Sequence, residues 1–426
     1  MEGNNLMKKI IFIVALVFAL ILLVVAYIIS WPKDAPVDIL EAHEDVYEQY
    51  QPHEYETDNQ IGEELYESNE SVISSEAPDM YEPYLPHDPM HDGDTSNPWH
   101  PIHFTDIRPA QPLDENTPHG YIAVGHIQYM SEHFYRRFPF SYQEKYAATW
   151  IVEELLAMGY TWDNIYVQEF GWAETIDFLR SDRNLDTLAT FGVIYDNYYY
   201  LRYTYQSQNV VLTVPGQSDQ VIVIGAHYDT VLYPGASDNA SGTALLLENA
   251  QRMLHMDNYY TLVYIFFGAE EAGLLGAYYY VASLTDEDLE KIVFMANADV
   301  LFEGPYFIFA AGHQNDNGSE VVNQNMITRQ WDDIAYQLSH THGITLISNP
   351  SSVFLGSDHL PFLEASVTVM VMFGAAYNTA GLRYFRVLHS HRDCFDYITE
   401  RWPYKIEDAM RTFSIFLEEV LLASYG

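Results

Sequence analysis

Histidine and acidic side chains lie in the stretches that follow several apolar runs of this sequence. They are His227, Asp229, Asp238, Glu270, Glu271, Asp299 and His389. Singly, each has an ordinary structural explanation: Asp238 is a good helix N-cap, and adjacent glutamates suit the first turn of a helix. Taken together they indicate a metal site, because ligands of α/β sheets gather beyond the carboxyl ends of the strands. No His-Glu-x-x-His, Gly-x-Ser-x-Gly or P-loop motif in the sequence favours another chemistry.

Two histidines and three carboxylates form a ligand set that suits zinc, with positions left open for water. One carboxylate that bridges two ions, with one histidine and one terminal carboxylate on each ion, uses the whole set. Two Zn²⁺ ions are then balanced by three carboxylates and a bridging hydroxide, and one glutamate remains as a general base. Two ions about 3.5–4 Å apart activate a water molecule and polarise a carbonyl. The sequence therefore predicts two Zn²⁺ ions as cofactors.

Strand and helix patterns alternate along the second half of the chain. We expect strands at 209–214, 220–226, 261–267, 292–298, 306–310 and 367–373, and helices at 141–158, 239–254, 271–283, 319–341 and 404–423. Residues 172–207 give mixed signals and are expected to form an irregular excursion. This order predicts an α/β fold with a mostly parallel central sheet flanked by helices on both faces. We assign residues 106–426 to this single domain.

The N-terminal region predicts a membrane anchor. Residues 10–30 carry no charge, and about 20 apolar residues cross a hydrocarbon core of about 30 Å. Lys8 and Lys9 precede them, so the positive-inside rule places residues 1–9 in the cytoplasm and the domain outside the cell. The alternative is a cleaved signal peptide. Its apolar region would be longer than the usual length of about 7–15 residues, and no clear small-x-small cleavage site follows.

Charge and cysteine content exclude other classes of protein. Residues 31–105 are rich in acids, with scattered proline and no apolar period, which predicts an extended, disordered stalk. The whole chain has 19 Lys and Arg against 60 Asp and Glu, a net charge of -41 that disfavours nucleic acid as a partner. Cys394 is the single cysteine, so neither an intrachain disulfide nor a multi-thiolate zinc site can form.

Several stretches resemble family M28 of zinc peptidases, the group of aminopeptidase Y and leucyl aminopeptidases. They are GAHYDTV at 225–231, GASDNASGTALLLENA at 235–250, FFGAEEAGLLGAYYY at 266–280, NAD at 297–299, GSDHLPF at 356–362 and HSHRDCFD at 389–396. NVVLTVPG at 209–216 also resembles the strand that precedes the first ligand of that family. The likeness is specific over about 205–400, looser over about 120–205, and absent from the N-terminal region.

The resemblance implies a role for each residue of the site. It assigns His227, Asp238 and Asp299 to one zinc ion, and Asp238, Glu271 and His389 to the other. It makes Glu270 the general base and Asp229 the partner that orients His227. The final family motif is His-Thr/Ser-x-x-Asp, which fits His389 with Asp393, although His391 is an alternative ligand. Asp358 and His359 match a motif that supports the site without binding metal.

The function that follows is a membrane-anchored, extracytoplasmic di-zinc aminopeptidase acting on peptides with a free N-terminus. Tyr377 and Tyr384 would line its substrate pocket. A glutaminyl cyclase with one zinc ion, and a carboxypeptidase or dipeptidase using Arg383 or Arg386, are the rival enzymes. A non-catalytic surface receptor on a peptidase fold is the rival from another class. Such a receptor is disfavoured because the ligands and the base are all present.

Overall fold

The computed structural model describes residues 113, 116–171, 206–231, 233–314, 321–322, 326–349, 353, 356–377, 383–384 and 387–424. The chain divides into two compact units, Met1–Gly93 and Asp94–Gly426, and every described residue belongs to the second. The expected anchor at 10–30 and stalk at 31–105 lie outside the described residues. Within the described ranges, no helix has both the length and the apolar character needed to cross a membrane.

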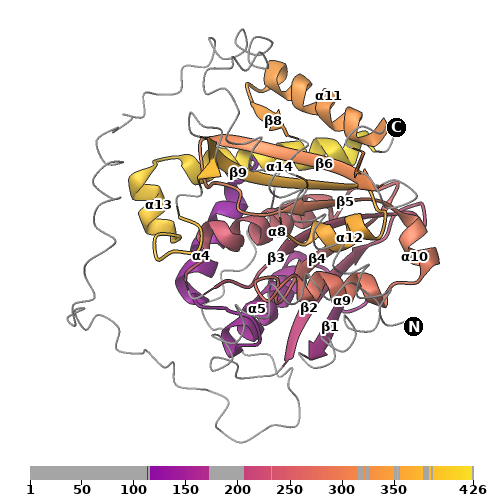
Figure 1. Ribbon diagram of the computed structural model, residues 1–426, viewed down its shortest axis with the longest axis horizontal. Helices are drawn as coiled ribbons and strands as arrows, with labels where there is room; N and C mark the ends of the chain where they lie inside the picture. The colour runs from indigo at the N-terminus through magenta and orange to yellow at the C-terminus, as the bar shows by residue number, and fades with distance from the viewer. Residues whose placement is uncertain are drawn as a thin grey trace, which may run out of the picture. The chain divides into compact units, whose positions relative to one another are not determined.

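The second unit alternates strands and helices (Figure 1). Its strands are β1 (Ile165–Gly171), β2 (Gln206–Val214), β3 (Val221–His227), β4 (Thr261–Phe267), β5 (Ile292–Ala298), β6 (Tyr306–Gln314), β7 (Val321–Val322), β8 (Leu346–Ser348), β9 (Val369–Tyr377) and β10 (Arg383–Tyr384). Its helices are α4 (Tyr121–His133), α5 (Tyr142–Met158), α8 (Ser241–Met253), α9 (Leu275–Ser283), α10 (Asp286–Lys291), α11 (Met326–Thr341), α12 (His359–Glu364), α13 (Phe395–Arg401) and α14 (Lys405–Ala423). A single π-helical turn, η3 (Ala236–Ala240), precedes α8.

The strands form one mixed sheet in the order β1-β2-β4-β3-β5-β9-β6-β7, and in Figure 1 they follow one another from β6 near the top to β1 near the bottom. The four central strands β4, β3, β5 and β9 run parallel. β2 is antiparallel to β4, β1 to β2, and β6 to β9. The expected parallel sheet is therefore present at the centre, whereas its outer strands are mostly antiparallel. Helix-linked crossovers join the central strands, and crossovers of this kind make neighbouring strands parallel.

Helices cover both faces of this sheet, as the alternating burial of the strands requires. On one face, Ile222 and Ile224 of β3 pack in a core with residues of α4, α5, α8, α11 and α14. On the other, Val223 packs in a second core that includes Ala277 of α9 and Phe362 of α12. A strand that is buried on both faces has a continuous apolar sequence. Such a run is the pattern from which β3 was predicted.

Two expected helices begin later than their sequence patterns predict. The helix expected at 271–283 begins at Leu275, because residues 269–274 form a turn in which Ala269 and Leu274 have positive φ. The helix expected at 319–341 begins at Met326, and Val321–Val322 pair with β6 instead. α4 and β1 were not predicted. The N-cap of α4 is Gly120, which has no side chain to signal a helix start.

Glu248 of α8 ties three helices together from a fully buried position. Its carboxylate accepts hydrogen bonds from the backbone of Gly120 at 2.7 Å and of Ala123 at 2.9 Å, so a side chain of α8 caps α4. It also accepts from Ser414 of α14 at 2.9 Å and from Arg252 at 3.0 Å. Gly120 has φ 82°, and a Cβ there would lie 2.4 Å from the backbone of Arg411, so only glycine fits beneath α14.

Replacing Glu248 with methionine is expected to lower the free energy of unfolding by about 3 kcal/mol, since it leaves buried amides and a guanidinium without their acceptor. Denaturant unfolding measures the change. Glu287, exposed on α10 and paired with Lys291, provides the control. Glu287→Gln should leave the unfolding midpoint where it is. Equal midpoints for Glu248→Met and the wild type would contradict this account of the junction.

Candidate metal centre

The candidate residues lie where the order of the central strands reverses. From β3 the chain crosses to β4 on one side and then to β5 on the other. In open α/β sheets the loops at such a switch point diverge and leave a crevice for ligands. His227 ends β3, Glu270 and Glu271 follow β4, and Asp299 follows β5. The fold therefore delivers these side chains to one end of the sheet, as their positions after apolar runs predicted.

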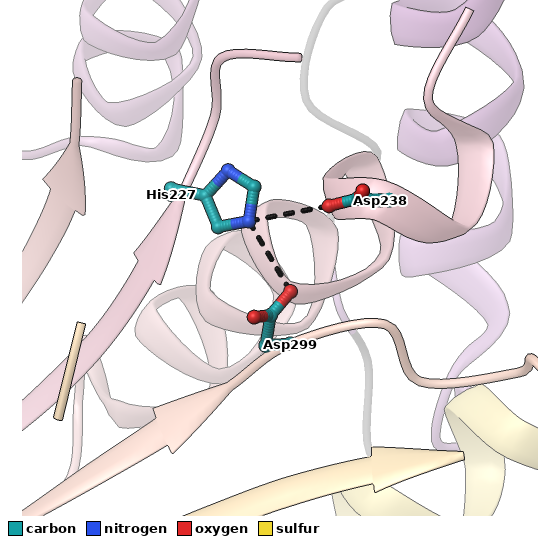
Figure 2. Close-up of side chains that lie close together, drawn as sticks. All are labelled: His227, Asp238 and Asp299. Carbon is teal, nitrogen blue, oxygen red and sulfur yellow. Dashed lines mark hydrogen bonds and ion pairs between the residues drawn. The ribbon is translucent and has the colours of Figure 1, made fainter. Parts of the chain in front are cut away.

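The first group of side chains is His227, Asp238 and Asp299 (Figure 2). Nε2 of His227 lies 3.3 Å from Oδ1 of Asp238 and 3.2 Å from Oδ1 of Asp299. Figure 2 shows both carboxylates turned toward this one nitrogen. All three residues are buried or nearly so. An imidazole nitrogen and two carboxylate oxygens gathered in this way form a donor set suited to zinc.

The second group is Asp238, Glu271 and His389. Nε2 of His389 lies 3.0 Å from Oδ2 of Asp238 and 3.2 Å from Oε2 of Glu271. Asp238 thus directs one carboxylate oxygen toward each histidine. The side chain of His389 is 52% exposed, so this group opens to solvent. His391 is exposed and belongs to neither group, which favours the spacing argument for His389.

Electrostatics couple the two groups through Asp238. Burial alone would raise the pKa of this carboxyl, but hydrogen bonds and charges from His227 and His389 outweigh burial and hold the pKa below its ordinary value. Burial would lower the pKa of His227, whereas the charges of Glu270 and Asp299 raise it well above its ordinary value. For His389 the bonds to Asp238 and Glu271 overcome burial and raise the pKa to about 12. In the metal-free protein a proton on each imidazole would supply positive charge beside the carboxylates that a bound cation would contact.

Two buried carboxylates hold the turn that carries the paired glutamates. Asp229 accepts hydrogen bonds from the amides of Glu270 and Glu271, each at 3.1 Å. Glu144 of α5 accepts from the preceding amide, that of Ala269, at 2.9 Å. Three consecutive amides are therefore satisfied by side chains, and no helix begins here. The turn places Glu271 in the second group and leaves Glu270 beside the first, with Oε2 3.9 Å from Nε2 of His227.

Asp229 also faces His227, as the sequence predicted for an orienting partner. Its Oδ1 lies 3.5 Å from Nδ1 of the imidazole, and its backbone carbonyl lies nearer, at 3.2 Å. The carbonyl is therefore the acceptor best placed for an Nδ1 proton. Such a contact fixes the tautomer that leaves Nε2 free for metal.

Other polar residues support the ligands. Asp393 accepts from the amides of Ser237 at 2.6 Å and Asp238 at 3.0 Å. Ser357 donates to Oδ2 of Asp299 at 2.7 Å. Three non-glycine residues at or beside the candidate site residues, Ala269, Val300 and His389, have positive φ, a strain that recurs at functional sites.

Asp358 and His359 are fully buried, and Nε2 of His359 lies 2.8 Å from the carbonyl of Val353. Burial raises the pKa of Asp358 well above its ordinary value, and the charge of His227 acts against burial. Neither residue belongs to a ligand group among the described residues, which agrees with a supporting role. Tyr377 and Tyr384 lie in the paired strands β9 and β10, where the structure describes the backbone but not their side chains.

Glu144 and Ser357 were not predicted as site residues. Ser357 lies inside the GSDHLPF stretch, so its neighbours already pointed to it. No motif points to Glu144 as a site residue. Its place three residues after Ser141 predicts only that it caps the start of a helix. Its contacts with Ser207, at 2.6 Å, and with Ala269 join segments far apart in the chain. Only the fold brings them together.

Parts of this chain are similar in sequence to known proteins. Residues 209–414 match Peptidase family M28. Aminopeptidase YwaD of Bacillus subtilis (strain 168) is 32% identical over 150 residues, which is 34% of this chain and 30% of that protein. Aminopeptidase Y of Saccharomyces cerevisiae is 34% identical over 120 residues, 27% of this chain and 22% of that protein. The matching segments thus span less than a third of these relatives.

Solved structures match over a larger share of the chain. BSAP, a zinc aminopeptidase from Bacillus subtilis, has a TM-score of 0.53 at 17% identity, covering 72% of this chain and 96% of that one. A glutaminyl cyclase from an Acidobacteriales bacterium has a TM-score of 0.51, also at 17% identity, covering 74% and 99%. The fold is therefore that of the zinc exopeptidases and is shared by both kinds of enzyme. Over residues 209–414, just under half of its length, this chain matches peptidase family M28.

Proposed function

We propose that this protein is a zinc aminopeptidase with two metal ions, which removes N-terminal residues from peptides. The observation that carries the proposal is the position of Asp238, whose Oδ1 faces His227 and whose Oδ2 faces His389. A carboxylate placed between two donor groups is the ligand that a pair of ions shares. His227 and Asp299 would complete one ion's ligands, and Glu271 and His389 the other's. The donors are those that zinc prefers.

Bound zinc and the protein's own residues would have different roles in the reaction. Zinc bound here would polarise the scissile carbonyl and lower the pKa of a water molecule. Glu270 is the proposed general base, since it lies beside the first group and binds no imidazole as closely as the ligands do. It accepts a proton from the attacking water and donates that proton to the leaving amine. Asp229 holds the amide of Glu270, which fixes the base relative to the ligands.

An N-terminal ammonium suits this site better than a C-terminal carboxylate. Carboxylates surround it, whereas recognition of a carboxylate terminus would need a cationic side chain. Among the described residues, Arg137 is the single fully buried arginine or lysine, and its donors are directed to backbone carbonyls. Arg386 and the side chain of Arg383 lie outside the described residues. These contacts favour aminopeptidase over carboxypeptidase action.

The test uses the purified full chain, its zinc content and a panel of peptides. We expect two zinc ions per chain and hydrolysis of peptides with a free N-terminus, but not of their N-acetylated forms. One ion together with cyclisation of N-terminal glutamine would identify a glutaminyl cyclase instead. Two ions with no hydrolysis of any peptide would refute the proposed activity.

We further propose that residues 10–30 anchor this peptidase in the cell membrane with the domain outside. The support is their length, their lack of charge and the preceding Lys8 and Lys9. Intact cells exposed to a protease should lose the domain while the anchor stays in the membrane fraction. A domain that is protected until the cells are lysed would refute the orientation.

Zinc binding is expected to release protons, so that the apparent zinc affinity rises with pH. In the metal-free protein both His227 and His389 have raised pKa values, and only a neutral imidazole binds zinc. Each proton released steepens the dependence by about tenfold per pH unit. Calorimetry in buffers of different ionisation enthalpy counts these protons. An affinity that is the same at about pH 6 and pH 8, across the ordinary histidine pKa, would contradict the expectation.

The same pKa values have the opposite effect on the metal-free fold. Because they are raised above the unfolded value of about 6.5, protonated His227 and His389 stabilise the fold fully below that pH. The contribution is lost as the pH rises through the folded pKa values. The metal-free protein is thus stabilised by these groups at low pH, and zinc replaces the protons at high pH.

A further inference from the structure

Arg137 lies in the loop between α4 and α5, and its side chain is fully buried. Its guanidinium donates three hydrogen bonds, all to backbone carbonyls. Nε donates to Tyr228 at 2.5 Å, Nη1 to Pro234 at 2.6 Å and Nη2 to Gly235 at 2.8 Å. One side chain therefore contacts both ends of the segment that joins β3 to η3.

That segment connects two of the proposed zinc ligands. His227 immediately precedes Tyr228, and Asp238 follows Gly235 by three residues. The backbone reinforces the contact, since the amide of Thr230 donates to the carbonyl of Arg137 at 3.0 Å. Gly235 has φ 62°, and a Cβ there would lie 2.2 Å from Cγ2 of Thr230. Thr230 and Gly235 of the segment thus lie close together beside the guanidinium.

The charge of Arg137 is unusual in its surroundings. No other arginine or lysine in the described part of the chain is fully buried. Burial lowers the pKa of Arg137 to about 10, while the carboxylates of Asp393, Asp229 and Asp238 act in the opposite direction. The group is therefore charged at neutral pH. A buried cation behind a cluster of carboxylates offsets the repulsion among them.

We propose that Arg137 is a positioning residue that holds His227 and Asp238 in the arrangement that binds zinc. It belongs to the N-terminal part of the domain, before residues 209–414 that match the family. The guanidinium fork fixes the segment between the two ligands at three points, and its charge stabilises the carboxylates in their ionised form. Residues that orient ligands in this way typically contribute about 10–100-fold to metal affinity. The inference rests on the proposed zinc site.

The test measures zinc affinity and thermal stability in the full chain. In Arg137→Met we expect the zinc dissociation constant to rise about 10–100-fold. The increase in Tm that zinc produces should shrink with it, because stabilisation by a ligand follows its affinity. Arg137→Lys keeps the charge but replaces the three-point fork with a single ammonium, so its affinity should lie closer to that of Arg137→Met than to the wild type. The lysine variant carries the test if the methionine variant does not fold.

Glu248→Met is the matched control, because Glu248 is also a buried charged residue that holds backbone groups, but those of α4. It should lower the Tm of the metal-free protein and leave the zinc affinity within about twofold of wild type. If Glu248→Met lost as much zinc affinity as Arg137→Met, the effect of Arg137 would come from the general stability of the fold. That result would overturn the proposal. Unchanged zinc affinity in both Arg137 variants would overturn it as well. A wild-type chain that binds no zinc would instead refute the proposed function, before any variant is compared.

Discussion

Glu270→Gln should reduce peptide hydrolysis by about 10²–10⁴-fold, the contribution of a positioned general base. The amide side chain has nearly the same size but cannot accept the proton of the attacking water. Burial raises the pKa of Glu270 well above its ordinary value in the metal-free protein, with the charge of His227 acting against burial and that of Glu271 adding to it. Bound cations would lower this pKa, which brings a base in this position toward the working pH.

The measurement is kcat for a good peptide substrate, with zinc content determined on the same samples. Zinc content should stay at the wild-type value, because Glu270 is in neither donor group. Glu270→Asp keeps a carboxylate one methylene further back and should retain part of the activity that the glutamine variant loses. Hydrolysis by Glu270→Gln within a few-fold of wild type at equal zinc content would remove Glu270 from the mechanism.

Asp238→Asn should weaken both zinc sites at once, since its two carboxylate oxygens face different histidines. The neutral amide offers one oxygen and no charge, so we expect zinc affinity to fall at least about 100-fold at each site. This loss is at the upper end of, or above, the loss expected when a residue that only orients a ligand is replaced. Activity should fall with the metal. Zinc titration followed by calorimetry, with stoichiometry from elemental analysis, measures both sites.

Asp299→Asn is the matched comparison for this prediction. Asp299 belongs only to the group of His227, whereas Glu271 and His389 complete the other. We therefore expect one tight zinc ion to remain in Asp299→Asn and none in Asp238→Asn. Two tightly bound ions in Asp238→Asn would show that the groups do not share this carboxylate.

The pattern of apolar residues correctly predicted the central strands and one of the helices that cover them. The expected strands 261–267 and 292–298 coincide with β4 and β5, and the expected helix at 141–158 coincides with α5 together with Ser141, its N-cap. Buried central strands carry continuous apolar runs, and α5 has both a side-chain cap at Ser141 and a glycine stop at Gly159. These signals are local, so the sequence contains them.

Sequence patterns mispredicted the starts of helices where contacts with distant residues replace local hydrogen bonds. The glutamates at 270 and 271 read as the first turn of a helix, but Asp229 binds their amides and the helix begins at Leu275. Asp238 reads as a helix N-cap, but α8 begins at Ser241 and Asp238 faces the two histidines. In both cases the side chain serves the site and not the helix.

The candidate ligands could be named from the sequence because each follows an apolar run inside a recognisable motif. The residues that hold them could not all be named. Glu144 and Arg137 reach the ligand loops across sequence separations of 125 and 91 residues. Neither lies in a recognisable motif. Arg137 binds backbone carbonyls and Glu144 binds backbone amides, and every sequence has these groups, so no partner residue type marks either contact.

The long separation between the candidate ligands sets an order in which a newly made chain can acquire them. The group of His227, Asp238 and Asp299 is complete once residue 299 has been synthesised, whereas His389 comes 90 residues later (389 − 299 = 90). At about 5–20 residues per second, that interval lasts roughly 5–18 s. Throughout it the chain carries every candidate donor except His389, so the paired site proposed here stays incomplete. Under the proposed function, a nascent chain would therefore be unable to cleave peptides until its C-terminal helices are about to be made.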